Sequence, residues 1–189
     1  FATAFVVNAF VSHRMDRGRH VGVWLRLLAI GEVRLARQSL RLLKKQSKAA
    51  AAGFKKAGIG ESEAIIREGQ SDWFKLLTAH YTTTTKTLIN YTFEQLGAKK
   101  ASFQDIVQRF IAQNALQKST LITGTTLDLI KSALLQGQEQ GLGQDDIAEL
   151  ISEKLGGDIS ESRAKTIART EIHNAATYGM QAAAEETEL

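Results

Sequence analysis

Apolar residues recur every three or four positions along most of the chain, which is the spacing of one helix face. Two such rows are Leu25, Leu28, Leu35, Ala36, Leu42 and Leu43, and Phe74, Leu77, Tyr81, Thr84, Leu88 and Tyr91. No segment alternates apolar and polar residues between hairpin turns, so the pattern predicts no strand. There is no proline to break a helix. The sequence therefore predicts an all-α fold of about six to eight helices, one or two of them long and elongated.

Glycines and N-cap residues set the expected helix ends. The expected helices cover about 20–51 (alone or after a shorter one at 2–17), 61–68, from 71 or 72 through 91, 104–116, from 125 or 126 to 141, 144–155 and 160–186. The fifth and sixth of these should bury Leu127, Ile130, Leu134 and Leu135, and Ile147, Leu150 and Ile151. Asp158 with Glu161 three residues later has the pattern of a capping box that opens the last helix.

The 189 residues suit one domain or two small ones. We divide the chain into a long basic helical arm at 1–57, a central helical region at 58–120 and a compact C-terminal helical module at 121–189. Residues 1–11 are apolar, but they are too short to span a bilayer and follow no basic region, so we expect neither a membrane span nor a signal peptide. This apolar segment should be covered by partners.

Charge is distributed unevenly along the chain. The net charge is +4, yet residues 14–56 hold twelve Lys and Arg against two acids, while residues 143–189 hold ten acids against four Lys and Arg. On the first long helix the cations follow one face, and this basic stripe consists of Arg34, Arg37, Arg41, Lys44, Lys45 and Lys48. The plain interpretation is a solvated helix face. The functional ones are non-specific contact with DNA phosphates or with an acidic protein surface.

Candidate chemistry is sparse. The chain has no cysteine, which excludes disulfides, thiolate metal sites and cysteine nucleophiles. The four histidines, His13, His20, His80 and His173, match no metal-binding spacing such as HExxH. No GxxxxGK loop or βαβ unit is present to cradle a nucleotide. We therefore expect no enzyme activity, no catalytic residue, no metal site and no cofactor.

The last helix is rich in small residues, which let another helix approach closely. They are Ala164, Ala168, Ala175, Gly179, Ala182 and Ala183. Arg169 and Glu171 are two positions apart and point about 200° away from each other, so each needs a partner of its own. Glu171, Asn174 and Tyr178 share one face. From the residues alone, the plain interpretation is a well-packed terminal helix with solvated charges.

The segment SRAKTIARTE, from Ser162 to Glu171, resembles the signature of the phage Mu F-like head-morphogenesis family, the minor head proteins of tailed phages. Its core is Ala168-Arg169-Thr170-Glu171, with Asn174 and Gly179 after it. The approach to the motif is similar too, with a helix that ends at Gly141-Leu142, a short helix, and a turn at Gly156-Gly157-Asp158. The resemblance covers residues 121–184.

The resemblance implies a structural protein of the virion, in the head interior or at the portal vertex, that passes through the host cytoplasm during assembly. It implies multiple copies per particle, the portal and other head proteins as partners, and a role in head assembly and in DNA packaging or delivery. The motif would then hold the fold, and any non-specific DNA contact would come from the basic stripe. Two alternatives stay open: a non-specific DNA-binding helical protein outside any virion, and the helical C-terminal part of a portal or adaptor polypeptide.

Overall fold

The computed structural model describes residues 17–96 and 103–186, and nearly all of these residues are helical. The helices are α2 (Arg17–Ala57), α3 (Ile59–Glu68), α4 (Gln70–Leu96), α5 (Phe103–Glu139), α6 (Gln144–Gly156) and α7 (Asp158–Glu186). No strand occurs in these two ranges, so the all-α prediction is confirmed. The apolar segment 1–11 and the helix expected at 2–17 fall almost wholly outside the described residues.

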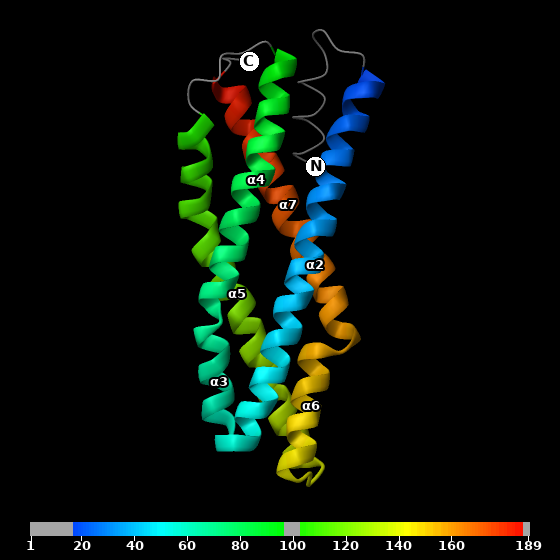
Figure 1. The fold of residues 1–189 in the computed structure, drawn as a ribbon, viewed down its shortest axis with the longest axis vertical. Coiled ribbons are helices and arrows are strands. Elements are labelled where there is room, and N and C mark those ends of the chain that lie inside the picture. The colour runs from blue at the N-terminus through cyan, green and yellow to red at the C-terminus, as the bar shows by residue number, and fades with distance from the viewer. Residues whose placement is uncertain (1–16, 97–102, 187–189) are drawn as a thin grey trace.

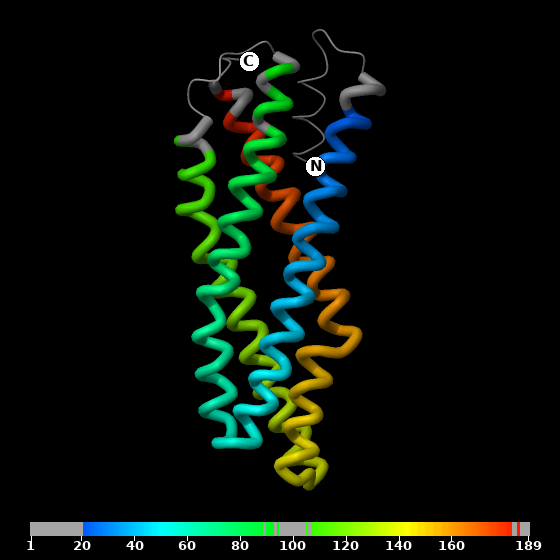
Figure 2. The backbone as a smooth tube through the Cα atoms, in the orientation of Figure 1, coloured from blue at the N-terminus to red at the C-terminus, as the bar shows by residue number. Residues whose placement is uncertain are grey.

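The helices are arranged as four rods rather than as six to eight separate elements. Gly69 alone separates α3 from α4, and Gly157 alone separates α6 from α7, so each pair runs on as one rod. Together with α2 and α5, these rods form an elongated bundle (Figure 1). α2 has 41 residues and α5 has 37, which makes them about 60 and 55 Å long at 1.5 Å per residue. The backbone trace in Figure 2 shows α2 packed beside both composite rods.

α5 is a single helix where the sequence predicts two, at 104–116 and from 125 or 126 to 141. The hydroxyls expected to cap the second helix bond within α5 instead. Thr125 Oγ1 donates to Leu121 O at 3.0 Å, and Thr126 Oγ1 donates to Ile122 O at 2.8 Å. A threonine that bonds to the carbonyl four residues earlier sits within a helix rather than starting one. The expected boundary between residues 120 and 121 therefore falls inside α5.

The two joints lie against adjacent residues of α2, the α3–α4 joint against Gln46 and the α6–α7 joint against Ser47. Gln46 and Ser47 are buried polar residues, and a methyl group added to Gly69 or to Gly156 would collide with Gln46 or Ser47 respectively. Gln46 Oε1 accepts a bond from Trp73 Nε1 at 3.0 Å, and Ser47 Oγ donates to Ser152 O at 2.9 Å. α2 thus aligns the two joints at one level of the bundle.

Most of the predicted apolar rows are buried, with three exceptions. Leu28, Leu35 and Leu43 of α2 are at most 2% exposed, and Leu77, Tyr81 and Leu88 of α4 at most 1%. Leu25, Phe74 and Leu135 were expected to lie in these rows but are exposed. In each case the residues that pack against the bundle lie roughly 100–200° around the helix from the exposed one. They are Trp24 beside Leu25, Trp73 beside Phe74, and Ala133 and Gly137 on either side of Leu135.

Two glycines of α5 provide a test of how the rods pack. A methyl group on Gly137 would lie 2.5 Å from Ile147 Cγ1 of α6, whereas one on Gly124 would meet no heavy atom within 4 Å. We expect Gly137→Ala to lower the free energy of unfolding by about 1–3 kcal/mol through overpacking. Gly124→Ala, the matched control in the same helix, should raise it by about 0.5–1 kcal/mol. Urea denaturation measures both, and equal effects from the two substitutions would contradict this packing of α5 against α6.

Candidate functional site

The glutamate of the motif joins three of the four rods. Glu171 projects from α7 and is 5% exposed. Its Oε2 accepts a hydrogen bond from Tyr81 Oη of α4 at 2.5 Å, and its Oε1 lies 3.9 Å from Lys118 Nζ of α5. An O–H donor so close to a carboxylate makes a strong, charge-assisted bond. The side chain therefore fixes α7 against both α4 and α5.

Aromatic rings surround the hydroxyl end of this network. Tyr81 meets Phe110 of α5 edge to face, with ring centroids 4.8 Å apart, and Phe110 meets Tyr178 of α7 at the same centroid distance. Burial, and then the charge and hydrogen bond of Glu171, raise the pKa of Tyr81 above its ordinary value. Tyr81 thus stays a neutral donor, as the bond to Glu171 requires. The face that Glu171 shares with Tyr178 is accordingly a packed face.

The other motif residues divide between the core and the surface. Ala168 is buried and Gly179 is buried, whereas Asn174 is half-buried. Arg169 and Thr170 are exposed. Within the described ranges, Arg169 has no ion pair or hydrogen bond, so the structure does not give it the separate partner that the sequence suggested. The structure does not bring Arg169 and Glu171 together, as the two-residue spacing predicts.

The small residues of α7 allow the close approach that the sequence predicts. Ala164, Ala168 and Ala175 are at most 1% exposed, and Ala182 is 8% exposed. Ala168 packs with Ile172 and Ala176 against Leu28 and Leu35 of α2. Side chains this small let the two backbones lie near each other, so α7 presents alanines to α2 and a carboxylate to α4 and α5.

Arg163, upstream in the same segment, contacts the middle of α5. Its Nη2 donates to Ile122 O at 2.7 Å and to Thr126 Oγ1 at 2.9 Å. Burial lowers the pKa of this guanidinium, although it remains charged at any ordinary pH. The contact holds α7 beside the stretch of α5 that the sequence predicts to be broken. Arg163 and Glu171 are thus two attachments from one helix to the same neighbour, about 12 Å apart along α7.

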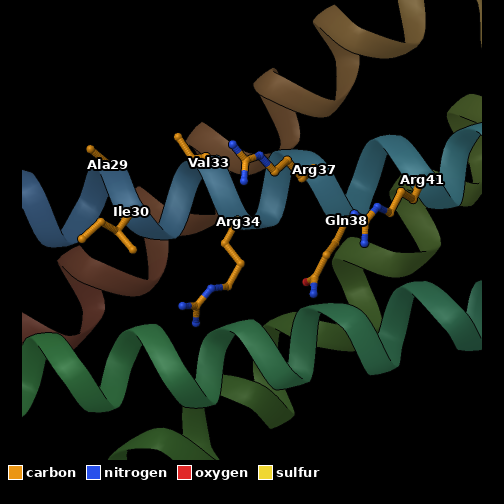
Figure 3. A pocket seen from close by; sticks show the side chains of 7 residues that line it. All are labelled: Ala29, Ile30, Val33, Arg34, Arg37, Gln38 and Arg41. Carbon is orange, nitrogen blue, oxygen red and sulfur yellow. The ribbon is translucent and has the colours of Figure 1, made fainter.

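The basic stripe lies on the outer side of α2, and all six of its side chains are exposed. Lys45 pairs with Asp72 of α4 at 3.1 Å. Lys44 and Lys48 line a groove of about 550 Å³ that also contains Glu149 and Glu153 of α6. Arg34, Arg37 and Arg41 form no ion pair or hydrogen bond with any described residue. They line a shallow groove of about 520 Å³ together with Ile30 and Val33, among others (Figure 3).

His80 of α4 lies close to this arginine group. Its Nε2 is 2.5 Å from Gln38 Oε1, which can only accept, so the imidazole carries its proton on Nε2. Burial first, and the charge of Arg34 second, lower the pKa of His80. The neutral form is therefore favoured, and the histidine ties α4 to α2. His173 of α7 makes a separate contact with α2, 2.9 Å from Glu32 Oε1.

A metal or membrane site finds no support in the part of the chain that the structure describes. There, no three His, Asp or Glu side chains gather in a way that would hold a metal ion. Over the same residues, no helix combines the length and apolar character needed to cross a bilayer.

The comparisons with known proteins give no further guide. No protein-family model matches the chain, and neither the curated proteins nor the solved structures contain a significant match.

The sequence did not identify the partners of Glu171. Tyr81 and Lys118 are 90 and 53 positions away from it, and only Tyr81 carried a signal, as a member of a predicted buried row. Nothing in the sequence around Lys118 distinguishes it from the other lysines, which are expected to be solvated side chains. The residues of the basic stripe were predicted from spacing alone, but the division of these residues into paired and unpaired cations was not.

The network around Glu171 yields a stability prediction. Glu171→Ala leaves the buried Tyr81 hydroxyl without an acceptor, and we expect it to lower the free energy of unfolding by about 2–4 kcal/mol. Glu171→Gln keeps an acceptor and should cost less. Thr170→Ala, one position away and exposed, should change stability by no more than about 0.5 kcal/mol. Thermal unfolding followed by circular dichroism measures all three. A loss for Thr170→Ala as large as that for Glu171→Ala would contradict a specific role for the carboxylate.

Proposed function

We propose that this chain is a structural minor head protein of a tailed phage, of the Mu F-like head-morphogenesis type. In this role it lies in the head near the portal vertex, in multiple copies, and aids head assembly and DNA packaging or delivery. The proposal rests first on the resemblance of residues 162–171, with Asn174 and Gly179. The end of α5, then α6, then α7 follow the order of elements that the resemblance leads us to expect, which supports the proposal.

One observation carries the structural rather than catalytic interpretation of the motif. Glu171 is buried and bonded to Tyr81, while Arg169 faces solvent, so the two charged residues of the motif act in different places. A catalytic pair would need both groups to reach one substrate. A carboxylate that ties three rods together instead keeps an elongated bundle rigid, which suits a protein whose role is to be assembled with others.

The proposal predicts that the protein is a component of the particle. We expect mass spectrometry of gradient-purified, DNA-filled heads from the phage that carries this gene to detect the chain in multiple copies, together with the portal protein. Deletion of the gene should reduce the yield of infectious particles. Glu171→Ala should reduce the amount of chain in heads, whereas Thr170→Ala should not. Infectious heads that lack the protein would overturn the proposal.

A second candidate, non-specific DNA contact, is favoured by the three arginines of α2 that have no partner among the described residues. Phosphate binding by cations weakens steeply with salt, because each contact releases counterions. We therefore expect duplex DNA of any sequence to bind at low salt and to dissociate at moderate salt, as measured by fluorescence anisotropy. Replacing Arg34, Arg37, Arg41 and Lys44 by glutamine should abolish binding. Absence of binding at low salt would exclude this candidate.

A further inference from the structure

A small pocket lies between α2 and α4, and its volume is about 120 Å³. The polar side of its wall consists of Arg34, His80, Thr83, Thr84 and Thr87. Leucine, isoleucine and glycine residues form the rest of the wall, and none of the described residues that line the pocket is acidic. The pocket thus brings one cation and three hydroxyls together without a carboxylate to compensate the charge.

Arg34 differs from the other arginines of the basic stripe in the direction of its side chain. Figure 3 shows that Arg34 and Gln38 extend from α2 toward α4, whereas Arg37 and Arg41 do not. None of these three arginines has an ion pair or hydrogen bond with a described residue. Arg34 alone among them lines the pocket, so its guanidinium is the charge that a ligand in the pocket would meet.

Two contacts between α2 and α4 lie on either side of Arg34. On one side, Gln38 bonds to His80. On the other, a methyl group added to Gly31 would lie 3.6 Å from Thr84 Oγ1, so this hydroxyl faces the space that the glycine leaves in α2. Arg34 lies between these two contacts along α2. The guanidinium and the Thr84 hydroxyl therefore reach the same pocket from opposite helices.

Thr84 supplies a buried hydroxyl without a partner. The residue is 8% exposed, and its Oγ1 forms no hydrogen bond with any described residue. The other two threonines of the pocket differ, since Thr83 Oγ1 donates to Ala79 O and Thr87 Oγ1 donates to Thr83 O, both at 2.9 Å. A buried hydroxyl that lacks a hydrogen bond costs free energy. Thr84 therefore needs an acceptor that the described part of the chain does not supply.

The free donors of the pocket favour an oxyanion as ligand. A guanidinium donates and cannot accept, and the proton of His80 Nε2 is already directed to Gln38. A ligand must therefore bring acceptor atoms for Arg34 and Thr84, together with negative charge. The pocket holds more than the roughly 10–15 Å³ that a water requires, and less than the roughly 300 Å³ at which sites for larger organic ligands begin. A tetrahedral oxyanion meets both conditions.

We propose that Arg34 and Thr84 bind a phosphate group between α2 and α4. The guanidinium offsets the charge of the group through charge-assisted hydrogen bonds, and the Thr84 hydroxyl donates to another of its oxygens. The bound group then links two helices that belong to different rods. This proposal goes beyond a role in head assembly and does not rest on it. The phosphate group can be inorganic phosphate from solution or part of a DNA backbone, and the experiment distinguishes these two sources.

Amide NMR spectra of the full chain, titrated with inorganic phosphate at constant pH and constant ionic strength, test the proposal. We expect saturable shifts for the residues around Arg34 and Thr84. Arg34→Gln and Thr84→Val should each weaken phosphate binding by about tenfold or more, because each removes a hydrogen bond to a charged group. Two matched controls on the same helices, Arg37→Gln and Thr82→Val, change side chains that do not line the pocket. They should leave the affinity unchanged.

Thr84→Val also separates phosphate binding from folding. Because the hydroxyl has no protein partner to lose, this variant should be at least as stable as the wild type without phosphate, as measured by thermal unfolding. A folded Thr84→Val chain that binds phosphate as tightly as the wild type would overturn the proposal. Wild-type shifts that do not saturate would overturn it too, and so would a control variant that is weakened equally.

Competition with duplex DNA identifies the source of the phosphate group. DNA that displaces inorganic phosphate from Arg34 and Thr84 of the wild type would identify the DNA backbone as the source. DNA that binds through Arg37 and Arg41 and leaves inorganic phosphate in place would identify the free ion. Both results require that phosphate binds at Arg34 and Thr84 in the first place.

Discussion

A carboxylate withdrawn from water must find donors inside the protein, and this requirement sets the position of α7. Glu171 meets it with a hydroxyl from α4 and an ammonium from α5, contributed by residues far apart in the sequence. The adjoining side of the same helix carries Ala168, Ile172 and Ala176, which pack on α2. A rotation or slide of α7 that improved one side would disrupt the other. The contacts of the motif therefore fix the rotation of α7 and its position along the other three rods.

This arrangement separates the motif into an inner and an outer part. Ala168 and Glu171 point into the bundle and hold it together, whereas Arg169 and Thr170 face outward. The segment before the motif adds Arg163, which reaches the middle of α5. A short sequence signature can thus serve mainly to position one long helix among three others. The buried part of the motif is therefore not available to other molecules, whereas the outer side of α2 is exposed.

Much of the fold could be predicted from the sequence, because helix periodicity is a local property. The long α2, the short α6 and the alanine-rich α7 follow directly from spacing and small residues. The single helix α5 could not be predicted, because its threonines are good N-caps as well as tolerable helix residues, and the contact of Thr126 with Arg163 from another rod is not visible in the sequence. The partners of Glu171 were unpredictable for the same reason, since tertiary contacts chose them. Whether Arg34, Arg37 and Arg41 have ion-pair partners could be decided only from the positions of the acids in the structure.

The position of Gln46 and Ser47 along the bundle, where both helix joints lie, has a consequence for how the bundle unfolds. On one side of it, Ala50 and Phe54 join α3, α6 and the second half of α5 in a core of their own. On the other side, α4, α7 and the first half of α5 pack in separate clusters around the motif. Among the described helices, only α2 and α5 cross this level without an interruption of the helix. The core thus divides into two parts in series, and we expect the part at the α3–α6 end to open and exchange its amide hydrogens while the motif stays packed.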